Sequence, residues 1–356
     1  MFRILPILIL VMYMLEIKHT LCPSCSVGCG LNVVINDGEI VGTFPYKRHP
    51  VNAGKNCLNG RSSIESYQNK FQKAIVSNSE VDIDKAIADV SKELGSVDAS
   101  KVTVICSGNN SIEEIKAIKE FGESKNFNVA FYADDLRDFG DVASYDDVEG
   151  AGKVFVIGDL LYENPLIGRR IVHAKQNGAK IYALSKNEKA VTYNIADEVF
   201  NSSVQEFLAA IDGEIDDSSV VVFNYVDSQD DLDKLEAVNC KILPVFTKSN
   251  TKGAFSIIDS KSKEEMIGLF EDTKLLLVFN DDIVSEFDFD FTRISKIISF
   301  ASSENDTTKM SDIVIPIKTW LEQDGSFVNA MGETQNFTSV IESDNLSEIE
   351  IIEKLN

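Results

Sequence analysis

The chain has 356 residues, 44% of them hydrophobic, so it is long enough to bury a sizeable core and to form two or three domains or lobes. Its 34 basic and 57 acidic side chains give a formal net charge of -23 at pH 7, which argues against nucleic acid or an anionic membrane as a partner. Three histidines leave little room for histidine-based metal or acid–base chemistry.

The first 14 residues contain a short apolar run, from Ile4 to Met14. This run is shorter than the roughly 20 residues that a membrane-spanning helix needs. It would suit the core of a signal peptide, but no small-residue cleavage site follows it. Export would also carry the chain's thiols into an oxidising compartment. We therefore interpret residues 1–14 as an apolar leader or a mis-assigned start, with Met14 as the true first residue, and expect a cytoplasmic protein without an integral membrane span.

Four of the six cysteines follow with the spacing C-x2-C-x3-C-x27-C, at Cys22, Cys25, Cys29 and Cys57. Three closely spaced thiols and a remote fourth favour a 4Fe-4S cluster, in which each iron takes one thiolate. A four-cysteine zinc site is the first alternative, but zinc ribbons usually pair one C-x2-C with a second C-x2-C, so this spacing favours the cluster. Four thiols without any ligand are the second.

Between Cys29 and Cys57, two alternating apolar runs meet at the turn Asn36-Asp37-Gly38, which predicts a β-hairpin that brings the fourth cysteine back to the other three. The residues LEIKHTL before the cysteines predict a first strand. His19 and His49 flank the motif. His49 is either a tuner of the cluster or an ordinary loop residue, and the cluster domain is expected to span residues 15–65.

From Val102 onwards, short β-branched runs alternate with helical patterns, which predicts βαβ units in a parallel sheet. Ser111 and Glu114 form the pattern of a capping box. Asn164-Pro165 is expected to open a helix that Asn177-Gly178 closes. His173 is expected on the surface of that helix.

The sequence thus predicts an α/β fold: a small N-terminal β-rich 4Fe-4S domain followed by one or two parallel-sheet lobes. We expect the lobes at residues 66–215 and 216–309, with residues 310–356 returning to the first lobe. The alternation in Glu286–Phe291 predicts an edge strand. Residues 106–110 lack a glycine fingerprint or a Walker lysine, so they predict an ordinary strand-to-helix turn. Cys106 and Cys240 are expected in the core.

The residues CPSCSVGCGL, HPVNAGKNC and the following Gly60 resemble the N-terminal cluster domain of the molybdopterin oxidoreductase superfamily. This group includes formate dehydrogenase alpha subunits and the large iron-sulfur subunit of respiratory complex I. Residues 142–185 and 311–335 are similar to two further segments of the superfamily, so the resemblance covers about half of the chain. The residues that carry this second part are Arg169, Arg170, Glu322, Asp324, Gly325 and Asn329.

The chain departs from the superfamily at positions that its catalytic members use. Those members place a cysteine or selenocysteine on the metal, whereas residues 131–144 hold no thiol, and Asp134 or Asp135 would have to bind the metal through oxygen instead. Residues 185–187 (Ser-Lys-Asn) stand where members of the superfamily usually present an acidic residue to the guanine of the pterin cofactor. Asn59 stands where a lysine commonly lies between the cluster and the pterin, and no second pterin-binding domain is found before residue 356. The resemblance therefore implies no catalytic residue and no Mo/W-bis-MGD cofactor.

Three functions remain open. The first is a subunit that relays electrons through one 4Fe-4S cluster to or from a redox partner subunit. The second is an enzyme, a formate dehydrogenase alpha-like or formylmethanofuran dehydrogenase B-like chain whose missing cofactor domain lies on another polypeptide. The third is a non-redox scaffold with a structural cluster. The missing thiol favours the first function over the second, and the regular cysteine spacing favours both over the third.

Overall fold

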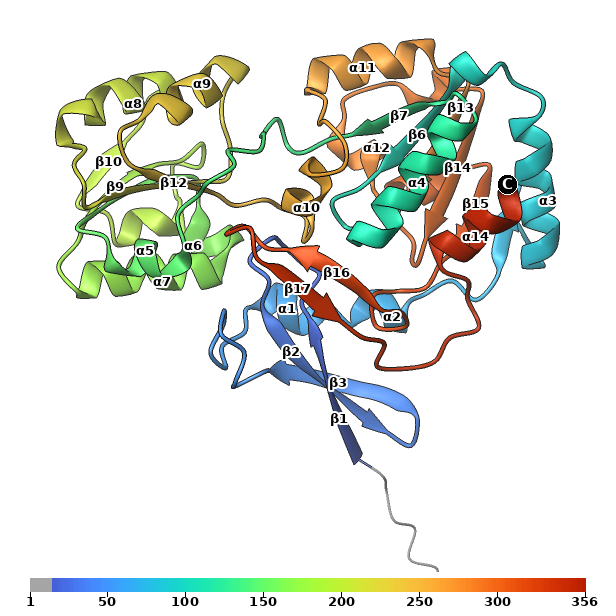
Figure 1. The fold of residues 1–356 in the computed structure, drawn as a ribbon, viewed down its shortest axis with the longest axis horizontal. Coiled ribbons are helices and arrows are strands. Elements are labelled where there is room, and N and C mark those ends of the chain that lie inside the picture. The colour runs from blue at the N-terminus through green and yellow to red at the C-terminus, as the bar shows by residue number, and fades with distance from the viewer. Residues whose placement is uncertain (1–14) are drawn as a thin grey trace, which may run out of the picture.

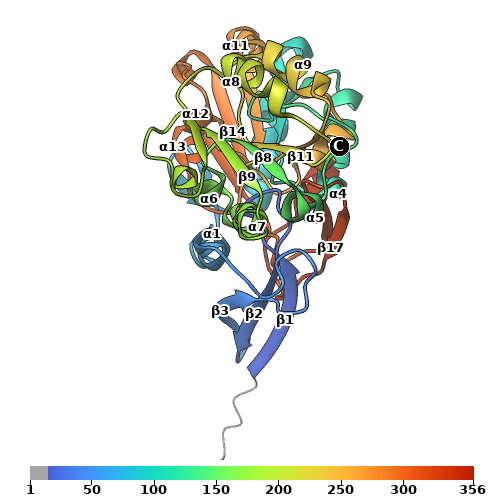
Figure 2. The same ribbon diagram turned by 90° about the vertical axis from the view of Figure 1, so that its left-hand side faces the viewer.

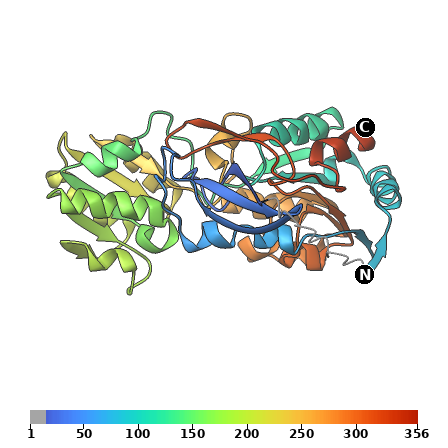
Figure 3. The ribbon, with the colours of Figure 1, turned by 90° about the horizontal axis from the view of Figure 1, so that it is seen from below.

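The structure is a computed structural model that describes residues 15–356, so the proposed start at Met14 lies outside the described residues. Two α/β lobes lie side by side, and a small β domain lies beneath their junction (Figure 1). Seen from below, the three-stranded sheet of this domain crosses the space between the lobes (Figure 3). None of the helices within residues 15–356 has both the length and the apolar character that crossing a membrane requires.

The larger lobe contains a seven-stranded sheet in the order β5-β4-β15-β14-β13-β6-β7. Five of its strands run parallel, and the β4–β5 hairpin adds an antiparallel edge. The strands are β4 (Ala74–Val76), β5 (Ser79–Val81), β6 (Val102–Cys106), β7 (Asn128–Phe131), β13 (Leu275–Phe279), β14 (Lys296–Ala301) and β15 (Ile313–Pro316). The helices are α3 (Ile83–Leu94), α4 (Ile112–Ser124), α10 (Thr251–Phe255), α11 (Lys263–Asp272), α12 (Ile283–Glu286), α13 (Asp306–Met310) and α14 (Glu348–Leu355).

The smaller lobe contains a five-stranded parallel sheet in the order β10-β9-β8-β11-β12. Helices α8 and α9 cover one face, and α5, α6 and α7 cover the other (Figures 1 and 2). The strands are β8 (Lys153–Ile157), β9 (Lys180–Leu184), β10 (Glu198–Phe200), β11 (Ser219–Phe223) and β12 (Lys241–Pro244). The helices are α5 (Tyr145–Gly150), α6 (Leu160–Glu163), α7 (Pro165–Gln176), α8 (Val204–Ile211) and α9 (Gln229–Ala237).

In both lobes the strand order reverses once, next to the first parallel strand. The reversal lies between β8 and β11 in the smaller lobe and between β6 and β13 in the larger lobe. In open parallel sheets the crevice for a ligand forms at the carboxyl ends of the strands at such a reversal. Each lobe therefore contains one topologically favoured binding position.

The division between the lobes differs from the predicted boundary at residue 216. Strands β11 and β12 pair with β8 in the smaller lobe, and β13 then pairs with β6 in the larger lobe. The smaller lobe is thus an insertion between β7 and β13. The predicted strands are present, but their assignment to sheets depends on distant pairing partners, which local patterns do not specify.

The cluster domain combines a three-stranded antiparallel sheet in the order β1-β2-β3 with two short helices. At the predicted hairpin turn, Asp37 and Gly38 have φ angles of 52° and 85°, which suit a tight turn between twisted strands. A second hairpin from the C-terminal region packs against this domain. The elements are β1 (Leu15–Leu21), β2 (Gly30–Asn36), β3 (Glu39–Pro45), α1 (Leu58–Ser62), α2 (Glu65–Gln68), β16 (Gly325–Val328) and β17 (Thr334–Phe337).

Helix ends follow the local sequence signals. Ser111 and Glu114 form the predicted capping box of α4. Helix α7 begins at Pro165, and Gly178 follows its end with a φ angle of 101°. The predicted edge strand at Glu286–Phe291 is wrong: Glu286 ends α12, and Phe291 begins a 3-10 turn. Its alternating phenylalanines instead pack around Phe270 of α11, which produces the same sequence pattern without a strand.

Candidate cluster site and adjacent crevice

The four spaced cysteines come together around one cavity at the top of the cluster domain. This cluster cavity has an empty volume of ≈ 300 Å³. Its lining also includes Asn56 and, from the smaller lobe, Asn164. The complete lining is Cys22, Cys25, Val27, Cys29, Asn56, Cys57, Asn164, Pro165 and Leu166.

Short-range structure positions the thiols. Cys22 directly follows β1, and its backbone N–H donates to the Cys29 carbonyl at 2.8 Å, which closes the loop that carries the first three cysteines. Gly28 has a φ angle of 74° in this loop, a conformation that L side chains rarely adopt. Cys57 is the N-cap of α1, and its Sγ accepts a hydrogen bond from the Gly60 N–H at 3.4 Å.

The electrostatics of the cavity oppose free thiolates. Burial, followed by the charge of Cys22, raises the pKa of Cys25 to about 12. Burial is also the main cause of the raised pKa of Cys22 and Cys29. Because metal ligation requires the deprotonated thiolate, a bound metal group would have to supply the positive charge that stabilises these thiolates.

The residues present fit a 4Fe-4S cluster. The cavity contains an orphan donor, since Asn56 Nδ2 is buried and has no hydrogen-bond partner in the described part of the chain. The backbone beside the cavity also requires glycine at position 60, because an added Cβ would lie 2.2 Å from Asn56 Oδ1 and 3.4 Å from Cys22 Sγ. Within residues 15–356, no three His, Cys, Asp or Glu side chains are arranged to hold a single metal ion. A cubane instead spreads its four thiolates over four irons.

Three other parts of the chain hydrogen-bond to the cysteine loop or to the residue before it. The Tyr145 hydroxyl of α5 donates to the Val27 carbonyl at 2.9 Å. The Ala330 N–H, in the β16–β17 hairpin, donates to the Ser26 carbonyl at 2.7 Å. Trp320 donates from Nε1 to the Leu21 carbonyl at 3.0 Å.

An open crevice adjoins the cluster cavity, and Cys25 and Cys57 line both spaces. Asn224 follows β11 and residues 161–165 follow β8, so the crevice lies at the reversal of strand order in the smaller lobe. Its empty volume is ≈ 1140 Å³. We call it the switch-point crevice, and its lining is Ser24, Cys25, Cys57, Leu58, Asn59, Leu161, Tyr162, Glu163, Asn164, Pro165, Val191, Asn224 and Thr247.

The switch-point crevice has an unusual charge balance for an anion site. None of these thirteen lining residues is Lys, Arg or His, and Glu163 adds a carboxylate. A pterin-guanine dinucleotide carries a pyrophosphate, which proteins commonly bind with cationic side chains or helix N-termini. The lining thus offers no side-chain cation for a pyrophosphate.

The corresponding position in the larger lobe is filled by the chain itself. Lys248 is buried there, with Nζ 2.7 Å from both Asp281 Oδ1 and Glu286 Oε1. Burial opposes the charge of Lys248, but these two carboxylates raise its pKa. Asn250 N–H donates to the Gly108 carbonyl at 2.7 Å, which places residues 248–251 against the turn at 106–110. That turn is therefore a packed strand-to-helix connection.

The remaining predicted residues have mostly structural contacts. Asp134 accepts from the Thr247 hydroxyl, and Asp135 accepts from the Lys263 N–H; neither lines the switch-point crevice. Arg170 contacts Asp146 and Glu149. The Ser185 hydroxyl accepts from the Asn187 N–H, and Glu322 pairs with Lys70. The side chains of Asp324 and Asn329 accept from the backbone N–H groups of Ser339 and Met331, respectively.

His19 and His49 do not line the cluster cavity. His19 stacks on Tyr46 with ring centroids 4.0 Å apart, and the His49 ring lies against Gly30. Asn56 and Asn164 reach the cavity instead. Sequence reasoning missed both asparagines; the only available signal for Asn56 was its place immediately before Cys57.

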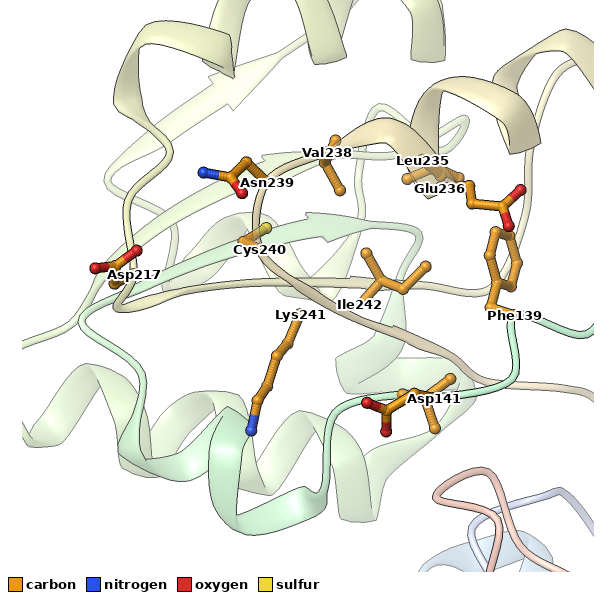
Figure 4. A pocket seen from close by; sticks show the side chains of 11 residues that line it. Phe139, Asp141, Asp217, Leu235, Glu236, Val238, Asn239, Cys240, Lys241 and Ile242 are labelled. Carbon is orange, nitrogen blue, oxygen red and sulfur yellow. The ribbon is translucent and has the colours of Figure 1, made fainter.

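A further pocket lies at strand β12 of the smaller lobe (Figure 4). Burial raises the pKa of its Cys240 thiol to about 11, which disfavours the reactive thiolate. Lys241 points away from Cys240 towards α5 (Figure 4), where its ammonium donates to Asp147 at 2.8 Å. Cys106 is fully buried in the larger lobe. These contacts give neither cysteine a partner for catalysis.

Two protein-family models match separate regions of the chain. The model of the molybdopterin oxidoreductase Fe4S4 domain matches residues 15–69, and the molybdopterin oxidoreductase model matches residues 234–348. The F420-dependent formate dehydrogenase 1 subunit alpha of Methanococcus maripaludis is 32% identical over 191 residues, which are 48% of this chain and 28% of the relative. The corresponding subunit of Methanocaldococcus jannaschii is 27% identical over 204 residues, 50% of this chain and 30% of the relative.

Solved structures share the fold at low sequence identity. Acetylene hydratase from Pelobacter acetylenicus superimposes with a TM-score of 0.64 at 11% identity, covering 95% of this chain and 68% of that chain. A chain of the formyltransferase/hydrolase complex from Methylorubrum extorquens, solved with methylofuran, superimposes with a TM-score of 0.55 at 11% identity, covering 79% of this chain and 97% of that chain. The α/β fold with an N-terminal β-rich domain is confirmed, and the expected resemblance to the molybdopterin oxidoreductase superfamily is confirmed for the two matched regions, residues 15–69 and 234–348.

Proposed function

We propose that this chain is an iron-sulfur redox subunit that relays electrons through one 4Fe-4S cluster, bound by Cys22, Cys25, Cys29 and Cys57, to or from a partner subunit. The observation that carries the proposal is that Cys25 and Cys57 line both the closed cluster cavity and the open switch-point crevice. When bound, such a cluster accepts and releases one electron at a time.

The residues around the cavity support this role by enclosing one side of the cluster and exposing the other. Cys22 and Cys29 are buried, whereas Cys25 and Cys57 are half-buried next to the crevice. Electron transfer to a partner is favoured where the insulating protein layer is thinnest. We therefore propose that the partner's redox group approaches through the switch-point crevice, along Leu58 and Asn59.

We further propose that the chain does not bind its own Mo/W-bis-MGD and has no catalytic residue. The crevice lining includes no cationic side chain for a pyrophosphate, and an unpaired buried charge is costly. The segment that resembles the metal-ligand region offers Asp134 and Asp135, both of which bind other residues of the chain. We propose a cytoplasmic location, because the four cysteine ligands must remain reduced.

A formate dehydrogenase alpha-like or formylmethanofuran dehydrogenase B-like catalytic subunit is the second candidate. Two observations favour it: the molybdopterin oxidoreductase model matches residues 234–348, and the open crevice lies at the position where α/β sheets bind ligands. In this case the crevice would hold a pterin cofactor together with a domain from another polypeptide.

Metal and cofactor analysis of protein purified without oxygen distinguishes the two candidates. We expect about four irons and four sulfides per chain, without stoichiometric molybdenum, tungsten or pterin, and a reversible one-electron signal from the cluster. Stoichiometric molybdenum or tungsten with a pterin fluorophore would replace the relay with the catalytic alternative. One zinc per chain and no iron would contradict both.

A further inference from the structure

The Asn56 side chain lines the cluster cavity and has a buried hydrogen-bond donor that residues 15–356 leave without a partner. Asn56 Nδ2 is buried without a partner among the described residues, although Asn56 directly precedes the ligand Cys57 and lines the cavity. Leaving a buried amide N–H unpaired is unfavourable, because the group loses its hydrogen bonds to water. An acceptor inside the cavity would remove this cost.

The backbone next to Asn56 makes room for this arrangement. A Cβ added at Gly60 would lie 2.2 Å from Asn56 Oδ1, so any larger residue would displace the carboxamide. The same point lies 3.4 Å from Cys22 Sγ, so the carboxamide and this sulfur flank the same small space. Gly60 N–H also donates to Cys57 Sγ. Gly60 therefore leaves room for the Asn56 carboxamide and donates its own N–H to a cysteine sulfur.

The other polar neighbours of the thiols already have partners. The Ser24 hydroxyl donates to the Asn59 carbonyl at 3.2 Å. Asn164 Oδ1 accepts from Asn224 Nδ2 at 3.3 Å. Asn56 is thus the cavity-lining side chain whose donor is left over, within the described residues.

We propose that Asn56 donates an N–H···S hydrogen bond to the bound 4Fe-4S cluster and thereby raises its reduction potential. This inference rests on the proposed function, because it requires the cluster. One-electron reduction adds a negative charge to the cluster, and a donor to its sulfurs stabilises the reduced form more than the oxidised form. Asn56 is not itself a ligand of the cluster and acts only through this hydrogen bond.

The test is a redox titration of the purified protein, followed by electron paramagnetic resonance. Asn56→Leu keeps a similar side-chain volume but removes the donor. We expect its oxidised-to-reduced ratio at a fixed potential to rise about tenfold, which is a shift of about 59 mV to lower potential for a one-electron couple. Asn69→Leu, at an exposed asparagine after α2, is the matched control and should keep the wild-type potential.

A second variant reaches the same hydrogen bond without changing Asn56. The methyl group of Gly60→Ala would occupy the position of the carboxamide, so the potential should shift in the same direction. If both variants keep a full iron content and the wild-type potential, this inference is overturned and the proposed function is left intact. If both variants lose the cluster, the inference is also overturned, because Asn56 then has a structural role. If Asn56→Leu alone loses the cluster, the potential of Gly60→Ala decides. A wild-type protein without any cluster would refute the proposed function itself.

Discussion

Ser26 and Phe246 are joined by two hydrogen bonds: Ser26 N–H donates to the Phe246 carbonyl at 3.1 Å, and Phe246 N–H donates to Ser26 Oγ at 2.8 Å. Both residues are fully buried. Ser26 lies in the cysteine loop, and Phe246 lies where the chain leaves β12. The cluster domain is therefore attached to the connection between the two lobes.

Ser26→Ala should lower the free energy of unfolding by about 1–3 kcal/mol, because it leaves the buried Phe246 N–H without an acceptor. Urea unfolding followed by circular dichroism measures the change. Ser62→Ala is the control, since the Ser62 hydroxyl makes an exposed hydrogen bond within the same domain. Equal unfolding midpoints for Ser26→Ala and the wild type would contradict the role of this attachment.

Cys25→Ala should abolish the visible charge-transfer absorption of the protein and reduce its iron content, because the cluster loses one of its four ligands. The segment at residues 15–60 should become sensitive to protease, since small domains of this kind depend on metal binding for their folding free energy. Cys240→Ala, outside the cavity, should retain the absorption and the protection. A wild-type spectrum in Cys25→Ala would disprove the ligand assignment.

Removal of the iron should change the fluorescence of Trp320, the one tryptophan of the chain. Its indole is buried and donates to the Leu21 carbonyl, next to the proposed cluster ligand Cys22. Without the cluster this segment loosens, so the indole becomes more exposed and its emission moves to longer wavelength. Titration with an iron chelator under denaturant-free conditions measures the shift, and Trp320→Phe gives the tyrosine background. Complete iron loss with unchanged emission would contradict this coupling.

Glu348→Gln should make the protein less sensitive to rising pH. The Glu348 carboxyl is fully buried, and burial, followed by the charge of Glu114, raises its pKa well above the ordinary value of 4.5. The folded protein therefore holds a proton that the unfolded chain releases above this value, so stability falls as the pH rises through that range. The neutral amide of the variant would mimic the protonated acid at every pH.

The measurement is the free energy of unfolding of the wild type and Glu348→Gln at about pH 5 and about pH 8. Relative to the wild type, the free energy of unfolding of Glu348→Gln should be higher at about pH 8 than at about pH 5 by at least about 1 kcal/mol, since one unit of pKa shift corresponds to about 1.4 kcal/mol. Glu353→Gln, at an exposed position of the same helix, controls for the change in net charge. A difference that does not change with pH would refute a buried protonated Glu348.

Local features of the fold were predictable from the sequence, because they depend on residues close together in the chain. The turn at Asp37-Gly38, the capping box at Ser111 and the helix start at Pro165 all follow from local chemistry. The extent of the lobes was not predictable in this way. Strand β11 pairs with β8 and not with β13, and this choice is made by side-chain packing between segments far apart in the sequence.

The candidate site was predictable to a similar degree. Cysteine spacing identified the four residues that the structure gathers, whereas Asn56 and Asn164 became visible only in three dimensions. The stretch Glu286–Phe291 does not form the predicted strand, because its phenylalanines pack around Phe270 and Glu286 pairs with the buried Lys248, both from other segments. Ion pairs between distant segments leave no periodic pattern in the sequence.

The insertion of the smaller lobe determines the order in which the contacts of the cysteine loop can form during synthesis. The chain is made from its N-terminus, so the cysteines are complete well before Phe246 and Ala330, the partners that close over Ser26. The sheet of the larger lobe also waits for β13, because Thr103 pairs with Leu276 across the whole insertion. Long-range pairings of this kind form late in folding. The cysteine loop therefore gains its hydrogen bonds to Phe246 and Ala330 only after these two later segments have been made.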